Sequence, residues 1–241
     1  MPNIALTLRY DGTNYHGWQT QKNLPTVCQT IAQAVERAVG HSVNLIGCGR
    51  TDAGVHAETY VANFRTDTQI PADRLPFAIH TPPDITVLDG HAVPDDFHAT
   101  FSCVRKEYTY RFYHAERHDP FLRNRSLFWS YPVSLDAWRS AAAEFAGTHD
   151  FKALRSEGTN VKTTVRTVYY CEVIEERENH FALKICANGF LYNMVRAITG
   201  TVLYKGLDKL NTVDEIFASR SRSAAGPTVP PHGLYMTGVW Y

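Results

Sequence analysis

Hydrophobic and polar positions alternate with two different periods along the first hundred residues. A period of two, typical of a half-buried strand, begins with Ile4, Leu6, Leu8 and Tyr10. Residues 26–39 have the helical period, with Thr26 and Gln29 as a capping-box pair and Gly40 after the last turn. Further strands are predicted over 43–47 and 59–64. This order of elements favours an α+β fold over strict βαβ alternation.

The rest of the chain repeats this mixture. Strands are predicted over 104–113, 167–174, 181–187 and 234–241, and helices over 134–146 and 191–204. Residues 70–101 are rich in Pro and Asp, which indicates a link between two domains. We therefore expect a first half of residues 1–100 and a second half of residues 101–241, arranged around one continuous sheet.

Three glycines surround an Arg-Thr-Asp step in Gly47-Cys48-Gly49-Arg50-Thr51-Asp52-Ala53-Gly54. Glycine permits positive φ and close approach of the backbone, so this stretch predicts a tight loop that presents Asp52 at the end of a strand. A rigid turn is a costly way to place a carboxylate that has no chemical role. Asp is also a common turn residue, so the loop alone leaves open whether Asp52 is catalytic or structural.

Two other side-chain groups suit a functional site. Tyr108, Tyr110 and Phe112 share one face of a strand, which forms either part of the core or a platform on which a nucleobase stacks. In the helix over 191–204, Arg196 lies off the apolar stripe. That arginine is either exposed to solvent or paired with a carboxylate that it keeps ionised.

Charge permits a polyanionic partner without requiring one. The net charge is zero, but residues 1–100 hold 6 Lys/Arg against 10 Asp/Glu, and residues 101–241 hold 18 against 14. Basic residues of the second half gather over 105–125 and 152–166. They are either phosphate contacts or ordinary solvated faces.

Composition narrows the remaining classes. A hydrophobic fraction of 44% with 20% charged residues is typical of a globular protein, and no apolar run is long enough to span a bilayer. No secretory signal is recognisable, and five cysteines without a CxxC pair indicate reduced, cytosolic thiols. Scattered histidines form no HExxH pair, and no nucleotide-binding or nucleophile-elbow motif is present, so no metal or cofactor is expected.

Nine consecutive residues, Gly49 to Ala57, and a set of shorter motifs occur in a fixed order along the whole chain. The shorter motifs are Tyr10-Asp11-Gly12, Gly17-Trp18-Gln19, Phe97-His98-Ala99, Lys106-Glu107-Tyr108-Thr109-Tyr110, Gly147-Thr148-His149-Asp150-Phe151, Arg166-Thr167, Met194-Val195-Arg196 and Gly233-Leu234-Tyr235. Together they resemble the TruA-type tRNA pseudouridine synthases. The resemblance extends from end to end.

This resemblance implies the pseudouridine synthase fold, with two α/β halves around a mixed, mostly antiparallel central sheet. It also implies a cytoplasmic homodimer that binds tRNA across both subunits and converts uridine to pseudouridine at positions 38, 39 and 40, without metal or cofactor. By the same resemblance Asp52 is the catalytic aspartate and Arg196 its charge partner. Tyr110 stacks on the uracil and is implicated in taking the C5 proton. Arg50 helps to flip or hold the nucleotide, and Leu234 lines the uracil pocket.

Some residues depart from the family pattern. Thr100 stands where the family usually has arginine, and residues 154–164 and 226–230 are also atypical. A non-catalytic RNA-binding module would not need Asp52, and a glycosidase-like hydrolase would need a second carboxylate, for which Glu58 shows no matched spacing. The combined residues favour the synthase. They do not choose between a glycal intermediate and a covalent adduct on the aspartate.

Overall fold

The computed structural model describes residues 1–158 and 160–241, which form two compact units. Unit 1 consists of Met1–Val104 and Tyr235–Tyr241, and unit 2 consists of Arg105–Leu234. These bounds differ from the expected halves, because residues 235–241 belong to the first unit. The atypical stretch 154–164 includes Thr159, which lies outside the described residues.

A mixed sheet forms the centre of unit 1. Its antiparallel strands are β1 (Asn3–Tyr10), β2 (Ile46–Gly47), β3 (His56–Arg65) and β4 (Ile85–Val93), and β10 (Leu234–Trp240) pairs with β3 in parallel. The predicted alternation in β1 is confirmed, since Leu6 and Leu8 are fully buried while Arg9 is exposed. The parallel pairing of β10 is the reason that residues 235–241 complete unit 1.

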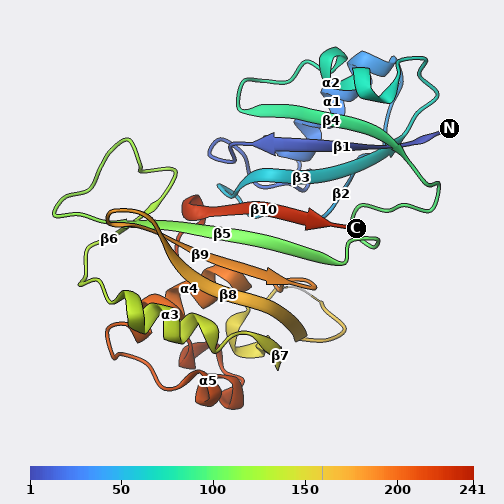
Figure 1. Cartoon of the computed structure of the whole chain (residues 1–241). Coiled ribbons are helices and arrows are strands. Elements are labelled where there is room, and N and C mark those ends of the chain that lie inside the picture. Colours follow the sequence, from blue (N-terminus) through green and yellow to red (C-terminus); the bar gives the residue numbers. More distant parts are fainter. Residues whose placement is uncertain (159) are drawn as a thin grey trace. The chain divides into compact units, whose positions relative to one another are not determined.

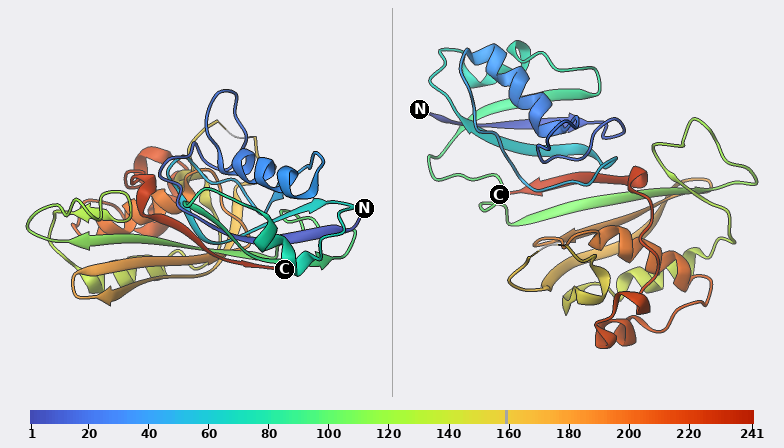
Figure 2. Two further views of the ribbon diagram at one scale, coloured as in Figure 1. Left: turned by 90° about the horizontal axis from the view of Figure 1, so that it is seen from above. Right: turned by 180° about the vertical axis from the view of Figure 1, so that it is seen from behind.

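Helix α1 (Val27–Val39) lies on one face of this sheet, as Figure 2 shows. The helical period is confirmed by a buried stripe that includes Val27, Ile31 and Val35. The capping box is wrong, because the Thr26 side chain makes no cap hydrogen bond with any described residue. The first amides of the helix, those of residues 27 and 28, donate instead to the carbonyls of residues 17 and 18. Those amides are therefore satisfied by the chain before the helix.

The interpretation of residues 70–101 as a link between domains is wrong. This stretch contains η1 (Ala72–Arg74), α2 (Leu75–Ala78) and β4, which pairs with β1 over its whole length. Its prolines lie at element ends, with Pro71 before η1, Pro76 in the first turn of α2 and Pro94 after β4. Proline is tolerated at such positions, so its abundance here indicated turns rather than a linker.

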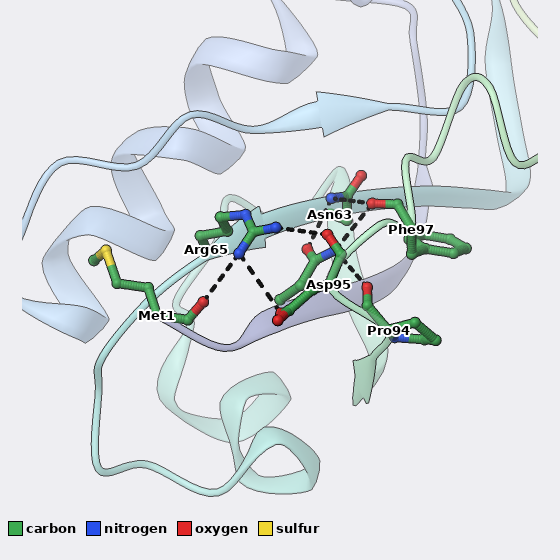
Figure 3. A network of polar contacts seen from close by, with 7 residues as sticks. Met1, Asn63, Arg65, Pro94, Asp95 and Phe97 are labelled. Carbon is green, nitrogen blue, oxygen red and sulfur yellow. Dashed lines mark hydrogen bonds and ion pairs between the residues drawn. The ribbon is translucent and has the colours of Figure 1, made fainter.

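Two buried asparagines attach the chain after β4 to the sheet (Figure 3). Asn63 on β3 donates from Nδ2 to Asn3 Oδ1 on β1 at 2.9 Å, and Asn3 Nδ2 donates to the carbonyls of Pro94 and Phe97 at 3.1 and 2.9 Å. The Ala99 amide donates to Asn63 Oδ1 at 2.9 Å. Buried amides are stable only when paired, so this network determines where residues 94–99 lie.

Unit 2 also contains a mostly antiparallel sheet with helices packed against it (Figure 1). The strand order is β5 (Arg105–His114), β9 (His180–Ala187), β8 (Val165–Arg177) and β7 (Gly147–Asp150), with β6 (Leu127–Trp129) parallel to β5. Its helical elements are η2 (Phe151–Leu154), α3 (Leu135–Ala143), α4 (Met194–Lys205), α5 (Val213–Ser219), η3 (Arg222–Ala224) and η4 (Pro231–Gly233). The α+β class and the mixed, mostly antiparallel pairing are confirmed.

Helix α4 is buried over most of its circumference. Thr199 and Gly200 lie on the same face of the helix as Arg196, and both are buried. A Cβ added to Gly200 would lie 1.8 Å from the Pro227 carbonyl oxygen, so residues 225–230 pass directly over this part of the helix. This covering leaves Arg196 half-buried rather than on a solvated face.

Candidate active site

Asp52 lies in a tight loop between β2 and β3, as the glycine pattern predicts. The Val55 amide donates to the Asp52 carbonyl at 3.2 Å, and Gly54 within this turn has a φ of 77°. Glycine adopts this left-handed conformation at little cost. The Asp52 side chain is half-buried, whereas Arg50 is exposed. One loop thus carries a partly sheltered carboxylate and an accessible guanidinium.

Main-chain hydrogen bonds hold this loop on both sides of the carboxylate. Before it, the Trp18 amide donates to the Thr51 carbonyl at 3.1 Å, and after it the Gly54 amide donates to the Tyr15 carbonyl at 3.2 Å. Gly17 makes the first of these contacts possible, because a Cβ added there would lie 2.3 Å from the Thr51 oxygen. Glycine at position 17 therefore allows the two segments to approach this closely.

Two tyrosine hydroxyls provide further support beneath the loop. Tyr10 Oη lies 2.9 Å from Thr51 Oγ1, and the Tyr60 hydroxyl donates to the Gly49 carbonyl. The Tyr60 ring stacks on Trp18 with ring centroids 4.2 Å apart. Burial raises the pKa of Tyr10 far above its usual value, so this hydroxyl stays neutral. The residues immediately before Asp52 are thereby held by both backbone and side-chain contacts.

A buried histidine connects the end of the loop to the end of β1. His56 Nδ1 lies 3.0 Å from Asp11 Oδ1 and 3.1 Å from the Gly12 amide nitrogen that donates to it. Its ring stacks on Tyr235 of β10 at 4.6 Å. A Cβ added to Gly12 would lie 1.9 Å from the Val55 carbonyl oxygen. The Tyr10-Asp11-Gly12 motif thus supports the same loop.

Thr100, where the resemblance leads us to expect arginine, has a structural contact at the start of the loop. Its Oγ1 donates to the Gly47 carbonyl at 2.6 Å, and the neighbouring Ala99 amide is held by Asn63. The Phe97-His98-Ala99 motif is therefore placed beside β2 and β3 by hydrogen bonds from both sheet and loop. At this position the chain has a short hydroxyl contact in place of a cationic side chain.

Within unit 2 the structure brings Tyr110 and Arg196 to consecutive carbonyl groups. Tyr110 on β5 is fully buried and donates from its hydroxyl to the Pro230 carbonyl at 2.7 Å. Arg196 Nε donates to the Val229 carbonyl at 2.8 Å, and its Nη1 donates to Asn193 Oδ1 at 2.7 Å. Burial raises the pKa of Tyr110 strongly, and the Arg196 charge offsets part of this effect. The Tyr110 hydroxyl is consequently a neutral donor.

Leu234 follows directly after a glycine that touches the Tyr110 ring. A Cβ added to Gly233 would lie 2.8 Å from Tyr110 Cε1, and Leu234 itself is buried. His232 lies in the same η4 turn, where burial lowers its pKa and the Arg196 charge lowers it further. His232 was not predicted as a site residue, since its sequence signal is limited to its place immediately before the Gly233-Leu234-Tyr235 motif.

The predicted site residues thus fall into two groups. Asp52 and Arg50 belong to unit 1, while Tyr110, Arg196 and Leu234 belong to unit 2. The pairing of Asp52 with Arg196 stays a prediction. Within residues 1–158 and 160–241, no three His, Cys, Asp or Glu side chains are grouped so that they could hold a metal ion. Over the same residues, no helix has the length and apolar character needed to cross a membrane.

A family model described as tRNA pseudouridine synthase matches residues 7–102 and 141–241. These two ranges include the Asp52 loop and, in unit 2, helix α4 and the residues leading into β10. The chain therefore belongs to the tRNA pseudouridine synthases, isomerases that convert uridine to pseudouridine in tRNA.

Relatives with a more particular name match over the full chain. Proteins named tRNA pseudouridine synthase A from Thermoanaerobacter sp. (strain X514) and Ruminiclostridium cellulolyticum are 45% and 42% identical to it, each covering 100% of both chains. The protein of that name from Acetivibrio thermocellus is 44% identical at the same coverage. The family and the enzyme class predicted from the motifs are confirmed.

Proposed function

We propose that this enzyme isomerises uridines 38, 39 and 40 in the anticodon stem and loop of tRNA, with Asp52 as the essential carboxylate. The observation that carries this proposal is the support of the Asp52 loop. Contacts from Gly17, Trp18, Tyr10 and Tyr60 converge on the residues just before it. A catalytic group held this firmly is preorganised for its reaction, which is the arrangement that enzymes need.

The reaction requires the N-glycosidic bond to break, the uracil to rotate and a new bond to form from C1′ to C5. A base cannot rotate within a stack, so the nucleotide must first be flipped out at a cost of a few kcal/mol. An ionised Asp52 then either removes a sugar proton to give a glycal or attacks C1′ as a nucleophile. Both routes need the carboxylate in its charged form. We propose that Arg196 supplies the compensating positive charge.

The other site residues have distinct proposed roles. The exposed Arg50 is available to hold or flip the nucleotide, and Leu234 provides apolar surface for the uracil. Tyr110 is proposed to stack on the uracil, which requires the groups that now bury its ring to move. Its neutral hydroxyl, which donates to Pro230, supports a stacking role better than a role as the base at C5.

We also propose that the enzyme acts as a cytoplasmic homodimer that needs no cofactor. The basic clusters of residues 105–125 and 152–166 supply charge suited to the phosphates of tRNA. Light scattering of the purified protein measures the subunit number directly. A monomer that retains full activity would contradict the dimeric part of this proposal.

Asp52→Asn tests the catalytic role, because it removes the charge while keeping the shape of the side chain. Loss of a proton-transfer group lowers a rate by roughly 100- to 10,000-fold. For Asp52→Asn we expect the rate of pseudouridine formation on an unmodified tRNA to fall at least about a thousandfold. Binding of tRNA should stay within about tenfold. Asp89→Asn, at an exposed aspartate of β4, is the matched control. Turnover of Asp52→Asn near that of the wild type would exclude Asp52 as the catalytic carboxylate.

Pseudouridine mapping on tRNA from cells that lack this protein tests the positions. Loss of the modification at 38, 39 and 40, restored by the wild-type gene but not by Asp52→Asn, is the expected result. Loss at other positions of the tRNA would keep the enzyme class and overturn the proposed specificity.

A further inference from the structure

A proline-rich stretch of unit 2 contacts Arg196 and Tyr110, two of the three side chains that this unit contributes to the proposed chemistry. We call residues 225–230 the proline segment. The carbonyl of Val229 accepts from Arg196 Nε at 2.8 Å, and the carbonyl of Pro230 accepts from the Tyr110 hydroxyl at 2.7 Å. Its two prolines have no amide hydrogen, so the segment offers more main-chain acceptors than donors. Its final two carbonyls each orient one of these side chains.

Arg222 holds the beginning of the proline segment. Its Nη1 donates to the Gly226 carbonyl at 2.8 Å and, with a longer contact, to the Ala225 carbonyl at 3.5 Å. Its Nη2 donates to Thr228 Oγ1 at 2.7 Å. A guanidinium is planar and offers five donors in a fixed geometry, so one side chain can hold several acceptors of one bend. Arg222 is therefore the main polar support of this part of the chain.

The segment is held against α4 from the other direction by close backbone contact. A Cβ added to Gly200 would lie 1.8 Å from the Pro227 carbonyl oxygen, and the Gly226 amide donates to Thr201 Oγ1 at 3.0 Å. The same helix carries Arg196. A shift of the proline segment along α4 would consequently change the position of the carbonyl that Arg196 contacts.

We propose that Arg222 is a positioning residue for uridine isomerisation: it holds the proline segment, whose last carbonyls orient Arg196 and Tyr110. This inference rests on the proposed function, in which those two side chains act on the flipped nucleotide. Arg222 acts through the segment and not by touching the uridine. A displacement of about 1 Å near reacting groups can lower a rate roughly a hundredfold, so the loss should appear in kcat.

Arg222→Met tests the proposal, because it keeps the length of the side chain and removes the guanidinium. Arg220→Met is the matched control. Arg220 is exposed, lies two residues before Arg222 in the chain, and forms an ion pair with Asp150 at 2.9 Å. Turnover is measured by release of tritium from tRNA that carries 5-tritiated uridine, because the new bond to C5 displaces that hydrogen. Amide hydrogen exchange of residues 225–230 and the melting temperature are measured on the same proteins.

We expect Arg222→Met to lower kcat by about tenfold to a hundredfold, to leave KM for tRNA within about threefold, and to speed exchange in residues 225–230. Thr228→Val removes one of the Arg222 contacts and should lower kcat in the same direction, by less. Arg220→Met should leave kcat within about twofold. Faster exchange confined to residues 225–230, at a melting temperature close to that of Arg220→Met, separates positioning from a general loss of folded protein, which would speed exchange throughout the chain and lower the melting temperature.

A folded Arg222→Met protein with wild-type kcat, or one that loses no more than Arg220→Met, would overturn the proposal. If Arg222→Met does not fold, Thr228→Val decides: reduced kcat at unchanged KM supports the inference, and unchanged kcat overturns it. Failure of the proposed function is visible separately, because wild-type protein would then modify uridines outside 38–40. The variants are in that case compared at the uridine that the wild type does modify.

Discussion

Gly17→Ala and Gly40→Ala form a matched pair that tests whether the geometry of the Asp52 loop limits the rate. The two glycines have nearly equal φ values, 82° and 81°. A side chain in this left-handed region costs about 1–2 kcal/mol at either position. For a chain of this size each kcal/mol lowers the melting temperature by about 2–4 °C, so the positive φ alone should cost each variant roughly 2–8 °C.

Only one of the two substitutions disturbs the loop. The new Cβ at position 17 would lie 2.3 Å from the Thr51 carbonyl oxygen, whereas ordinary contact begins at 3.4 Å, and nothing lies within 4 Å of a Cβ at position 40. The Thr51 carbonyl must therefore retreat by about 1 Å, and Asp52 is the next residue. A misplacement of that size lowers a rate by roughly a hundredfold, which corresponds to about 2.7 kcal/mol in the barrier.

Tritium release at saturating tRNA measures kcat for the pair, and circular dichroism measures their melting temperatures. The expected outcome is a loss of stability in both proteins, larger in Gly17→Ala because of its contact with Thr51, and a large loss of kcat in Gly17→Ala alone. If the two variants had kcat values within about threefold of each other, the loop would be able to relax around the new methyl group. The inference that Gly17 sets the position of Asp52 would then be refuted.

The Tyr10 hydroxyl, the basic clusters and the buried His232 each allow a further test. Tyr10→Phe removes the hydrogen bond to Thr51 and keeps the ring, so kcat should fall about tenfold with about 1 kcal/mol of lost stability; unchanged turnover would show that Thr51 is held without it. Affinity for tRNA, measured by fluorescence anisotropy, should fall at least tenfold between about 50 and 200 mM salt, and a flat profile would mean that the basic clusters do not meet phosphate. Burial lowers the pKa of His232 below its usual value of 6.5. As the pH falls below about 6.5, the unfolded chain therefore binds more protons than the folded chain, and the stability of the wild type decreases. His232→Gln should reduce this fall in urea unfolding, and an unchanged pH dependence would contradict the assignment.

The strands and helices with strong local periods could be predicted from the sequence. β1 and α1 each bury a continuous apolar stripe, and the hydrophobic pattern follows that burial directly. β4 was missed because the prolines on both sides of it suggested a linker, although Ile85 and Val87 alternate as in any half-buried strand. The place of β10 in unit 1 could not be predicted, because parallel pairing with β3 depends on residues far apart in the chain.

The Asp52 loop was visible in the sequence because its glycines mark a backbone that few other residues permit. Tyr60 and Arg222 left no comparable signal. Each acts through hydrogen bonds to backbone carbonyls, and the acceptors become available only when distant segments approach each other. Locally, Tyr60 resembles any core residue of a strand, and Arg222 resembles any surface arginine. Residues that support a loop through such long-range contacts are therefore harder to predict than the loop itself.

The last strand of the chain, β10, belongs to the unit that the first 104 residues form, and this affects folding during synthesis on the ribosome. Residues 235–241 are translated only after all of residues 105–234, which at roughly 5–20 residues per second takes about 7–26 s. During that interval His56 lacks the Tyr235 ring on which it stacks, and β3 lacks the parallel partner that pairs with its first residues. The first 104 residues emerge early but cannot assemble the complete support of the Asp52 loop until β10 arrives. The Asp52 loop thus gains its full support late in synthesis, and until then the unpaired edge of β3 is open to pairing with other chains.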